Sequence, residues 1–312
     1  DYVLENRYPE LKKVIDKSKF RNVVMKLTEL EFMQVDIKKK VYLKQYGSDF
    51  LINRIKDRSS SNEYNFELVE INVERPETTS DLNPFYLDTN GVTVKLKTGF
   101  SAGVTGTVDG DSSGTIYTAV DETMLRNMDP NTDDFTKVCT TLVVNMIFLF
   151  RGTNFNQNIN SWDVSNVNSM EYMFTDNTSF NQPLNQWDVS NVNNMRYMFN
   201  NTIFNQFING WDVSKVNQMQ FMFASSNFNQ AIYQWNVLTV NNMQCMFKNS
   251  LFNKSIGGWD VSNVTQMDSM FKNATNFDQN LSNWCVEQIA SEPTFFATNS
   301  PIENDNTKLP NW

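Results

Sequence analysis

The chain has 312 residues, a net charge of −9, three cysteines and no histidine. The acidic balance argues against a nucleic-acid partner, because clustered Lys and Arg are what bind a phosphate backbone. The absence of histidine excludes Ser-His-Asp, Cys-His and His-metal sites, and cysteines without CxxC spacing indicate neither a zinc site nor a disulfide framework. No apolar run reaches the roughly 18 residues of a membrane span. We therefore expect a non-enzymatic protein without metal or cofactor.

Residues 1–75 are expected to form a small α+β attachment domain. A short helix is predicted over residues 10–20, where apolar side chains share one helical face. Four strands are predicted, over residues 22–27, 41–45, 50–56 and 67–73. The turn-forming segment Tyr46-Gly47-Ser48-Asp49 predicts that the second and third strands form a hairpin. Because the chain opens with Asp1, we expect a processed protein or a part of a longer one.

Residues 76–130 read as a linker followed by a β lead-in. Candidate strands are residues 92–96 and 115–118, and a short helix is predicted from Asp121 to Met128, ahead of a proline. Between the two strands, Asp109–Gly114 is either a polar turn or a calcium loop. The turn is favoured because the other ligand positions of an EF-hand are absent.

A repeat dominates residues 131–312. Six of the seven tryptophans recur at spacings of 25, 24, 24, 24 and 25 residues, at Trp162, Trp187, Trp211, Trp235, Trp259 and Trp284. A period of this length indicates stacked supersecondary units that bury their apolar faces against one another. The six tryptophans are therefore predicted to form the core of the repeat.

Each unit is expected to contain one strand and one helix. In the unit of residues 180–201, the spacing of Leu184, Trp187 and Val189 predicts a strand with these side chains inward. Ser190 is placed to cap a helix. The apolar face of that helix would consist of Val192, Met195, Met198 and Phe199. The predicted fold class is thus an α/β solenoid, leucine-rich-repeat-like with 24–25-residue repeats, preceded by a small mostly β domain.

A Phe-Asn-Gln motif recurs once in most repeats, as in Phe180-Asn181-Gln182. The Phe is expected inside. The Asn is expected to hydrogen-bond backbone groups of the adjacent unit, because loop peptides there have no ladder partner; ligand binding is the alternative. The first unit lacks a tryptophan and the last loses the methionines after Trp284, so both are expected to be terminal caps.

The recurring sequence motifs resemble those of a known family. The pattern Trp-Asp-Val-Ser-x-Val-x-x-Met-x-x-Met-Phe, followed by Phe-Asn-Gln, resembles the BspA-like leucine-rich-repeat surface-protein family over about residues 115–312. The resemblance implies surface display and adhesion, in bacteria and in their viruses, and it implies no catalytic residues. The unit around Trp235 departs from the pattern, with Asn236 in place of Asp and Leu238-Thr239 in place of Ser-Asn, so a binding row would be interrupted there.

Residues 20–75 are also similar to a small β-domain of tail-tip or baseplate structural proteins, in phages of Bacteroidetes-type hosts. The segments that carry this similarity are Val41-Tyr42-Leu43, Phe50-Leu51-Ile52-Asn53-Arg54-Ile55 and Glu67-Leu68-Val69-Glu70-Ile71. It implies an attachment role within a particle. An ordinary β lead-in of a cell-surface protein is the alternative.

The outward side chains of the predicted strands are the candidate ligand-binding residues. Because side chains alternate along a strand, stacking would align one column of Asp163, Asp188, Asp212, Asn236 and Asp260. Tyr233 is predicted as the one aromatic residue on that face. The column either accepts hydrogen bonds from backbone N–H groups near the following Ser or binds a glycan or a cation. Equivalent carboxylates lack the asymmetry that a glycosidase needs, so catalysis is not expected.

These features predict a structural and recognition protein of a virion or an extracellular surface. The first hypothesis is a component of a phage tail or virion that displays the repeats for host-surface binding. The alternative is a bacterial cell-surface adhesin. In both hypotheses, other particle or surface proteins bind the N-terminal domain, and a host-surface glycan or protein binds the repeats.

Overall fold

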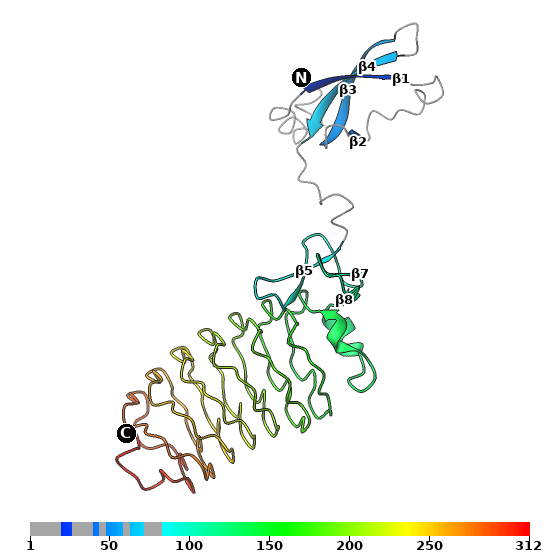
Figure 1. Ribbon diagram of the computed structural model, residues 1–312. Coiled ribbons are helices and arrows are strands. Elements are labelled where there is room, and N and C mark those ends of the chain that lie inside the picture. Colours follow the sequence, from blue (N-terminus) through cyan, green and yellow to red (C-terminus); the bar gives the residue numbers. More distant parts are fainter. Residues whose placement is uncertain (1–19, 27–39, 44–47, 59–62, 72–82) are drawn as a thin grey trace. The chain divides into compact units, whose positions relative to one another are not determined.

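The computed structural model describes residues 20–26, 40–43, 48–58, 63–71 and 83–312. The chain divides into two compact units, Asp1–Leu82 and Asn83–Trp312 (Figure 1). The lead-in from residue 83 onwards therefore belongs to the same unit as the repeats. The helix expected over residues 10–20 and most of the linker lie outside the described residues.

The first unit contains a four-stranded antiparallel sheet. Its strands are β1 (Phe20–Lys26), β2 (Lys40–Leu43), β3 (Ser48–Arg58) and β4 (Glu63–Ile71), in the order β1-β4-β3-β2. All four lie close to the predicted positions. The predicted hairpin is confirmed, because β2 pairs antiparallel with β3 and Leu43 lies opposite Ser48.

The lead-in of the second unit consists of short strands and one helix. Strands β5 (Phe85–Leu87) and β6 (Val94–Leu96) pair antiparallel, and β7 (Thr105–Gly106), β8 (Tyr117–Ala119) and β9 (Val138–Cys139) form a second sheet. Helix α4 (Glu122–Asn127) begins after the N-cap Asp121, as predicted. A 3-10 turn, η2 (Phe135–Lys137), follows it. Residues 109–114 lie in the connection between antiparallel strands β7 and β8, where Ser113 donates to Asp111 in a polar turn.

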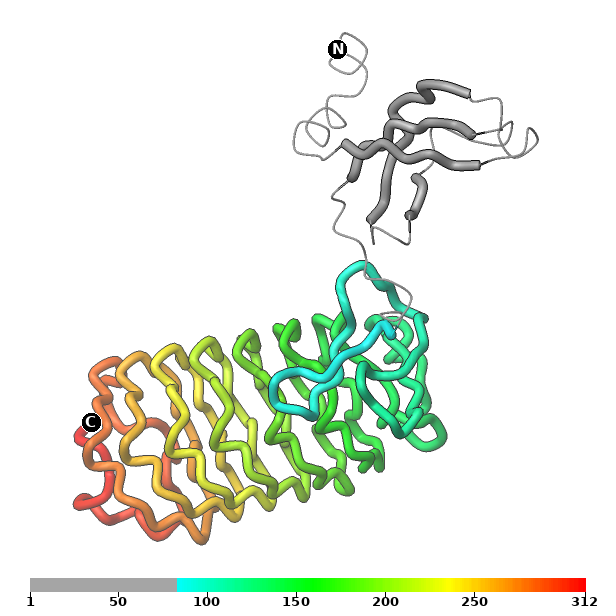
Figure 2. Tube along the Cα trace, turned by 45° about the horizontal axis from the view of Figure 1, so that its top comes forward, coloured from blue at the N-terminus to red at the C-terminus, as the bar shows by residue number. Residues whose placement is uncertain are grey.

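Beyond β9, the chain winds into stacked coils that lie side by side in chain order (Figure 2). Equivalent positions of successive coils are joined by parallel β-bridges, from Asn145↔Ser169 through Asn194 and Gln218 to Asn242↔Gln266. The core runs through the whole stack as one cluster of buried Trp, Met, Phe, Val, Ile and Leu side chains. The six repeated tryptophans belong to it, with exposed fractions between 0% and 4%.

The repeats contain neither the helix nor the strand that the sequence predicts. Over residues 140–312, all of which the structure describes, the backbone forms turns and single bridges only. The stretch around Met195 shows the reason. The N–H groups of Met195, Tyr197 and Phe199 donate to carbonyls of the next coil, whereas those of Met198 and Asn200 donate three residues back within their own coil. This alternation replaces the bonds of a helix, and Ser190 consequently caps none.

Both ends of the stack are covered. In the stretch equivalent to that around Met195, the N–H groups that bond between coils donate to the next coil, which leaves the corresponding carbonyls of the first coil without a donor from a preceding coil. Arg126 of α4 donates through its guanidinium to the carbonyls of Asn145 and Ile147 at this end. At the other end, N–H groups of Ser269 and Phe271 donate to a final coil around Phe296.

We propose to classify the arrangement as a solenoid built from turns in place of α/β units. None of the helices that the structure describes is long and apolar enough to cross a bilayer.

Candidate functional site

The tryptophan row is a structural ladder. Neighbouring indole rings are nearly parallel, with centroids 6.4–6.5 Å apart along the whole row. Each indole Nε1–H donates to a carbonyl of the preceding coil, as Trp211 does to Leu184 at 3.0 Å. A buried tryptophan needs such a partner, because an unpaired N–H in an apolar core is costly. The indole rings and their N–H groups therefore serve the fold and are not available to a ligand.

The asparagines of the Phe-Asn-Gln motif form a second ladder. The Oδ1 atom of Asn181 accepts the backbone N–H of Asn205 at 2.9 Å, and the Oδ1 of Asn205 accepts that of Asn229 at 2.8 Å. The Gln side chain of the next coil donates to the same oxygen, as Gln230 does to Asn205. The expected hydrogen bonds to the adjacent unit are confirmed, and these oxygens are already occupied.

The predicted Asp column also has local partners. Each member accepts the backbone N–H two residues ahead, at N···O distances of 3.0–3.2 Å, for Asp163, Asp188, Asp212, Asn236 and Asp260. Such a turn satisfies a loop N–H, which is the structural interpretation of the column. Asn accepts this bond as well as Asp does, so the exchange at Asn236 breaks no contact of the fold.

Asp163 differs from the rest of the column and cannot meet a ligand. Its side chain is 2% exposed, and its second oxygen accepts the hydroxyl of Thr141 at 2.7 Å. This burial could not be read from the sequence, because Thr141, which covers Asp163, lies in the preceding coil. By contrast, Asp188, Asp212 and Asp260 are exposed and stay candidates. Tyr233, three residues before Asn236, is 62% exposed.

The electrostatics of the exposed column do not indicate a cation site. Hydrogen bonds from Ser214 lower the pKa of Asp212, and hydrogen bonds from Ser262 lower that of Asp260. Crowded, uncompensated carboxylates would raise each other's pKa instead. Across the residues that the structure describes, no group of three or more His, Cys, Asp and Glu side chains is placed to hold a metal ion.

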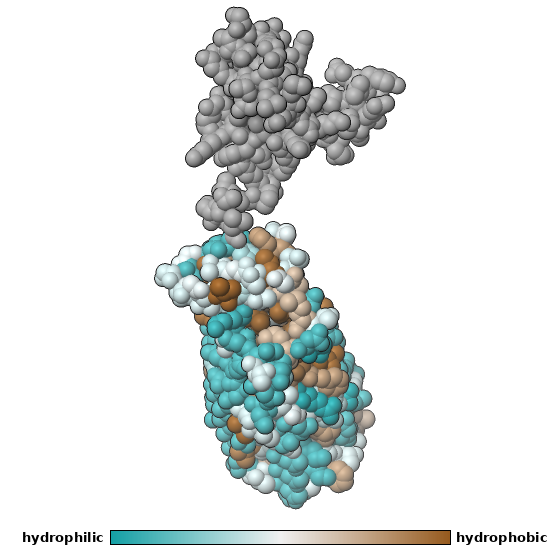
Figure 3. Space-filling model, turned by 90° about the vertical axis from the view of Figure 1, so that its right-hand side faces the viewer, coloured by the Kyte–Doolittle hydropathy of each residue, from teal (hydrophilic) through white to brown (hydrophobic). Residues whose placement is uncertain are grey.

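A different row of exposed side chains emerges from the structure. Phe148, Tyr172, Tyr197 and Phe221 occupy equivalent positions of four successive coils, and we call them the aromatic row. Their ring centroids lie 5.0, 4.5 and 4.4 Å apart in sequence order, with neighbouring rings stacked. Phe148 is 48% exposed, and the other three rings are half-buried. The face of the second unit that Figure 3 shows is mainly hydrophilic, with limited hydrophobic patches.

Two arginines flank the aromatic row. The guanidinium of Arg151 lies 5.4 Å from the ring centroid of Phe148 and 5.3 Å from that of Tyr172. Arg196 lies 5.1 Å from the ring of Tyr197 and pairs with Glu171 at 3.3 Å. These distances are those of cation–π contacts. The row therefore combines aromatic surface with the positive charge of Arg151, whereas Glu171 balances the charge of Arg196.

The backbone of the aromatic row is unusual. All four residues have positive φ angles, between 57° and 61°. The left-handed conformation costs an L-residue roughly 1–2 kcal/mol, and Gly or Asn adopts it most readily. The later coils place Cys245 and Ser269 at the same position and conformation. A large ring is thus no requirement of the coil, although stacking of the four rings on one another contributes to stability.

Sequence reasoning missed this row because the segment was expected to be helical. A signal was present nonetheless: an aromatic residue directly precedes the second Met of several units, at positions 172, 197 and 221. Read as a repeat position in its own right, it recurs with the same period as the tryptophans. On a helix, however, its direction relative to the core would have been different.

Comparisons with known proteins agree with the repeat. The family model described as "Mycoplasma protein of unknown function, DUF285" matches residues 120–227 and 201–312, more than half of the chain. This is a repeat family related to BspA-like surface repeat proteins. No curated protein and no solved structure matches the chain.

Proposed function

The chain belongs to the DUF285 repeat family, and on that premise we propose that it is a non-enzymatic recognition protein of an extracellular surface. The observation that carries the proposal is the aromatic row with its two arginines. Exposed aromatic residues and Arg are enriched at the centres of protein–protein interfaces. A row kept in a strained backbone conformation, where a small residue suffices in other coils, is best explained by contact with a partner.

The geometry favours a protein partner over a glycan at this row. Because the rings stack on one another, their faces are covered and their edges point outward. Sugars bind aromatic residues through the ring face, whereas ring edges and guanidinium groups suit carbonyl and carboxylate oxygens. The partner we propose therefore presents backbone carbonyls or acidic side chains.

Of the two settings considered for such a protein, the cell surface is favoured. The family description refers to a cellular organism, and the family is related to surface repeat proteins. The phage hypothesis depends on short apolar segments in β2, β3 and β4, and strands with such segments occur in many folds. We therefore propose a cell-surface adhesin, with a virion component as the second candidate. The N-terminal unit would attach it to other surface proteins.

Binding of the labelled full chain to cells tests the proposal. The panel contains bacterial cells, which the virion proposal requires, and eukaryotic cells as further targets of an adhesin. The decisive variant combines Tyr172→Ser and Tyr197→Ser, because Ser269 adopts the same conformation in a later coil. We expect at least a tenfold loss of binding, as for interface hot spots, and loss of wild-type binding after protease treatment of the cells.

Two controls separate the candidate surfaces. Tyr233→Ser removes an exposed tyrosine outside the row and should bind like wild type. Asp188→Asn with Asp212→Asn keeps the local hydrogen bonds, so the fold should stay intact, and reduced binding by this variant would assign recognition to the Asp column. If the row variant binds like wild type, or if binding resists protease but not glycosidase, the proposed protein contact at the row is wrong.

A further inference from the structure

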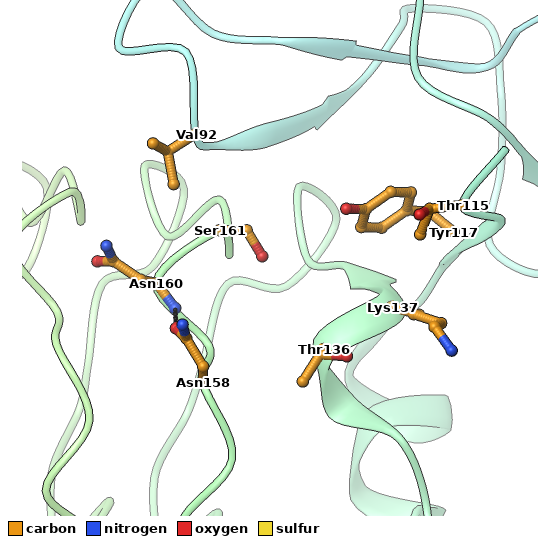
Figure 4. Close-up of a pocket in the computed structure, with 8 residues that line it drawn as sticks. All are labelled: Val92, Thr115, Tyr117, Thr136, Lys137, Asn158, Asn160 and Ser161. Carbon is orange, nitrogen blue, oxygen red and sulfur yellow. Dashed lines mark hydrogen bonds between the residues drawn. The ribbon is translucent and has the colours of Figure 1, made fainter. Parts of the chain in front are cut away.

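A cleft of about 450 Å³ lies where the lead-in meets the first tryptophan-bearing coil (Figure 4). Tyr117 comes from β8 and Thr136 from η2, while Asn158 and Ser161 come from the coil of Trp162. Val92 of the lead-in covers the upper side in this view. The volume falls within the roughly 300–1,000 Å³ of small-molecule sites. The cleft is separate from the aromatic row and from the Asp column.

The walls of the cleft are fixed to one another. The N–H of Val94 donates to the carbonyl of Ser161 at 2.9 Å, which attaches the lead-in to the coil. The Gln157 side chain accepts from the N–H of Phe135 at 2.8 Å and donates to the carbonyl of Asp133 at 2.7 Å, which attaches η2 to the same coil. A cleft whose sides are bonded in this way is preformed, so a ligand would pay little ordering entropy.

Three polar groups at the cleft have no protein partner. In the part of the chain that the structure describes, no hydrogen bond involves the Tyr117 hydroxyl, the Ser161 hydroxyl or the side-chain N–H₂ of Asn158. The Tyr117 hydroxyl points across the cleft towards Ser161 (Figure 4). Partial burial raises the pKa of Tyr117, so this hydroxyl keeps its proton at neutral pH and can both donate and accept. The three groups together offer matched donors and acceptors.

The lining also limits the charge of a ligand. The Lys137 ammonium is paired with Asp134 at 2.9 Å, and its side chain points away from the centre of the cleft (Figure 4). No carboxylate lines the space, which argues against a cation, and no unpaired cation lines it, which argues against phosphate. Val92 and the Tyr117 ring supply the limited apolar surface. Hydroxyl and amide groups next to one aromatic ring suit a ligand rich in hydroxyl groups.

We propose that this cleft binds one neutral saccharide unit. Hydroxyl groups of a pyranose would exchange hydrogen bonds with Tyr117, Ser161 and Asn158, and its C–H groups would contact Val92 and the Tyr117 ring. The inference extends the proposed recognition function, and depends on it only for the expectation that the saccharide comes from a surface glycan. The protein partner at the aromatic row would be bound separately.

Saturation-transfer NMR with the full chain and a panel of methyl pyranosides, neutral and sialylated, tests the cleft. Wild type should bind at least one neutral member. Tyr117→Phe and Ser161→Ala should each weaken that binding roughly three- to tenfold, the effect of one hydrogen bond. Because neither hydroxyl has a protein partner, both variants should keep the wild-type melting temperature. Tyr86→Phe serves as the matched control and should bind like wild type, because Tyr86 is exposed and does not line the cleft.

Three results would overturn the inference: no binding by wild type to any neutral pyranoside, binding that the Tyr117 and Ser161 variants leave unchanged, or binding of sialylated members alone. The variant with Tyr172→Ser and Tyr197→Ser should still bind the saccharide. Saccharide binding without cell binding would therefore count against the proposed adhesin and not against the cleft, and the opposite pattern would count against the cleft alone.

Discussion

At the scale of single residues, the repeat solves the problem of burying a polar atom with each large ring. Each indole of the row is covered by its neighbours on both faces except at the ends, and its N–H meets a carbonyl of the preceding coil. The apolar area of the ring and the directional hydrogen bond therefore favour the same position. This agreement explains why tryptophan, and not another large residue, recurs there.

Replacing Trp211 with Ala should destabilise the protein by about 3–5 kcal/mol, the usual cost of emptying a large aromatic site. The change removes the ring contacts with Trp187 and Trp235 and the indole hydrogen bond to the carbonyl of Leu184, which keeps only the backbone N–H of Trp187. Urea unfolding followed by circular dichroism measures the loss. Tyr233→Ala, at an exposed position, should stay within about 0.5 kcal/mol of wild type. A loss below about 1 kcal/mol for Trp211→Ala would contradict the role given to the ladder.

At the scale of elements, the sequence predicts what is buried better than how the backbone runs. Val192, Met195, Met198 and Phe199 are all buried, as their spacing predicts. The same spacing is satisfied by turns whose N–H groups alternate between the next coil and their own. The left-handed residues that end helical geometry here are Tyr197 and Asn201, and no glycine marks them in the sequence. A local pattern therefore could not distinguish the two conformations.

The candidate sites depend on contacts that a local pattern does not contain. The cleft forms because β8, η2 and the coil of Trp162 converge, although they are separated in the chain. Asp163 is buried for a related reason, since Thr141 from the preceding coil covers it. The Asn ladder was predictable, by contrast, because an asparagine repeated in phase with the tryptophans must meet its own equivalents in neighbouring coils.

The Asn ladder gives a test of bonding between coils. Asn205→Ala would leave the N–H of Asn229 without its acceptor. It would also remove one of the two acceptors of the Gln230 side-chain amide, which would keep the backbone carbonyl of residue 205. We expect a loss of roughly 1–3 kcal/mol in unfolding free energy, the cost of an unsatisfied, partly buried donor. Asn205→Asp keeps an acceptor oxygen and should lose clearly less. Equal losses for the two variants in urea unfolding would show that the hydrogen bonds are not what stabilises this position.

At the scale of the whole second compact unit, Asn83–Trp312, the free energy of unfolding should be close to a sum of the contributions of single coils and of the contacts between neighbouring coils. Bridges, indole contacts and Asn bonds all join a coil to the next one only, at separations near 24 residues. Repeat proteins with such contacts behave as one-dimensional arrays. The ends are the exception, because Arg126 at one end and Phe296 at the other cover groups that have no further coil.

This organisation predicts that one whole coil can be removed. Deleting residues 205–228 joins Phe204 to Asn229, which occupies the position of Asn205 in the next coil, 24 residues on. The tryptophan, asparagine and methionine rows would close in register. We expect a folded protein that unfolds cooperatively at lower urea, with a smaller m-value because less surface is exposed on unfolding. Deleting residues 205–216 instead removes half a coil, places polar side chains at core positions and should prevent folding. If circular dichroism and tryptophan fluorescence found both deletions equally unfolded, the stability of the unit would depend on the array as a whole and not on contacts between neighbouring coils.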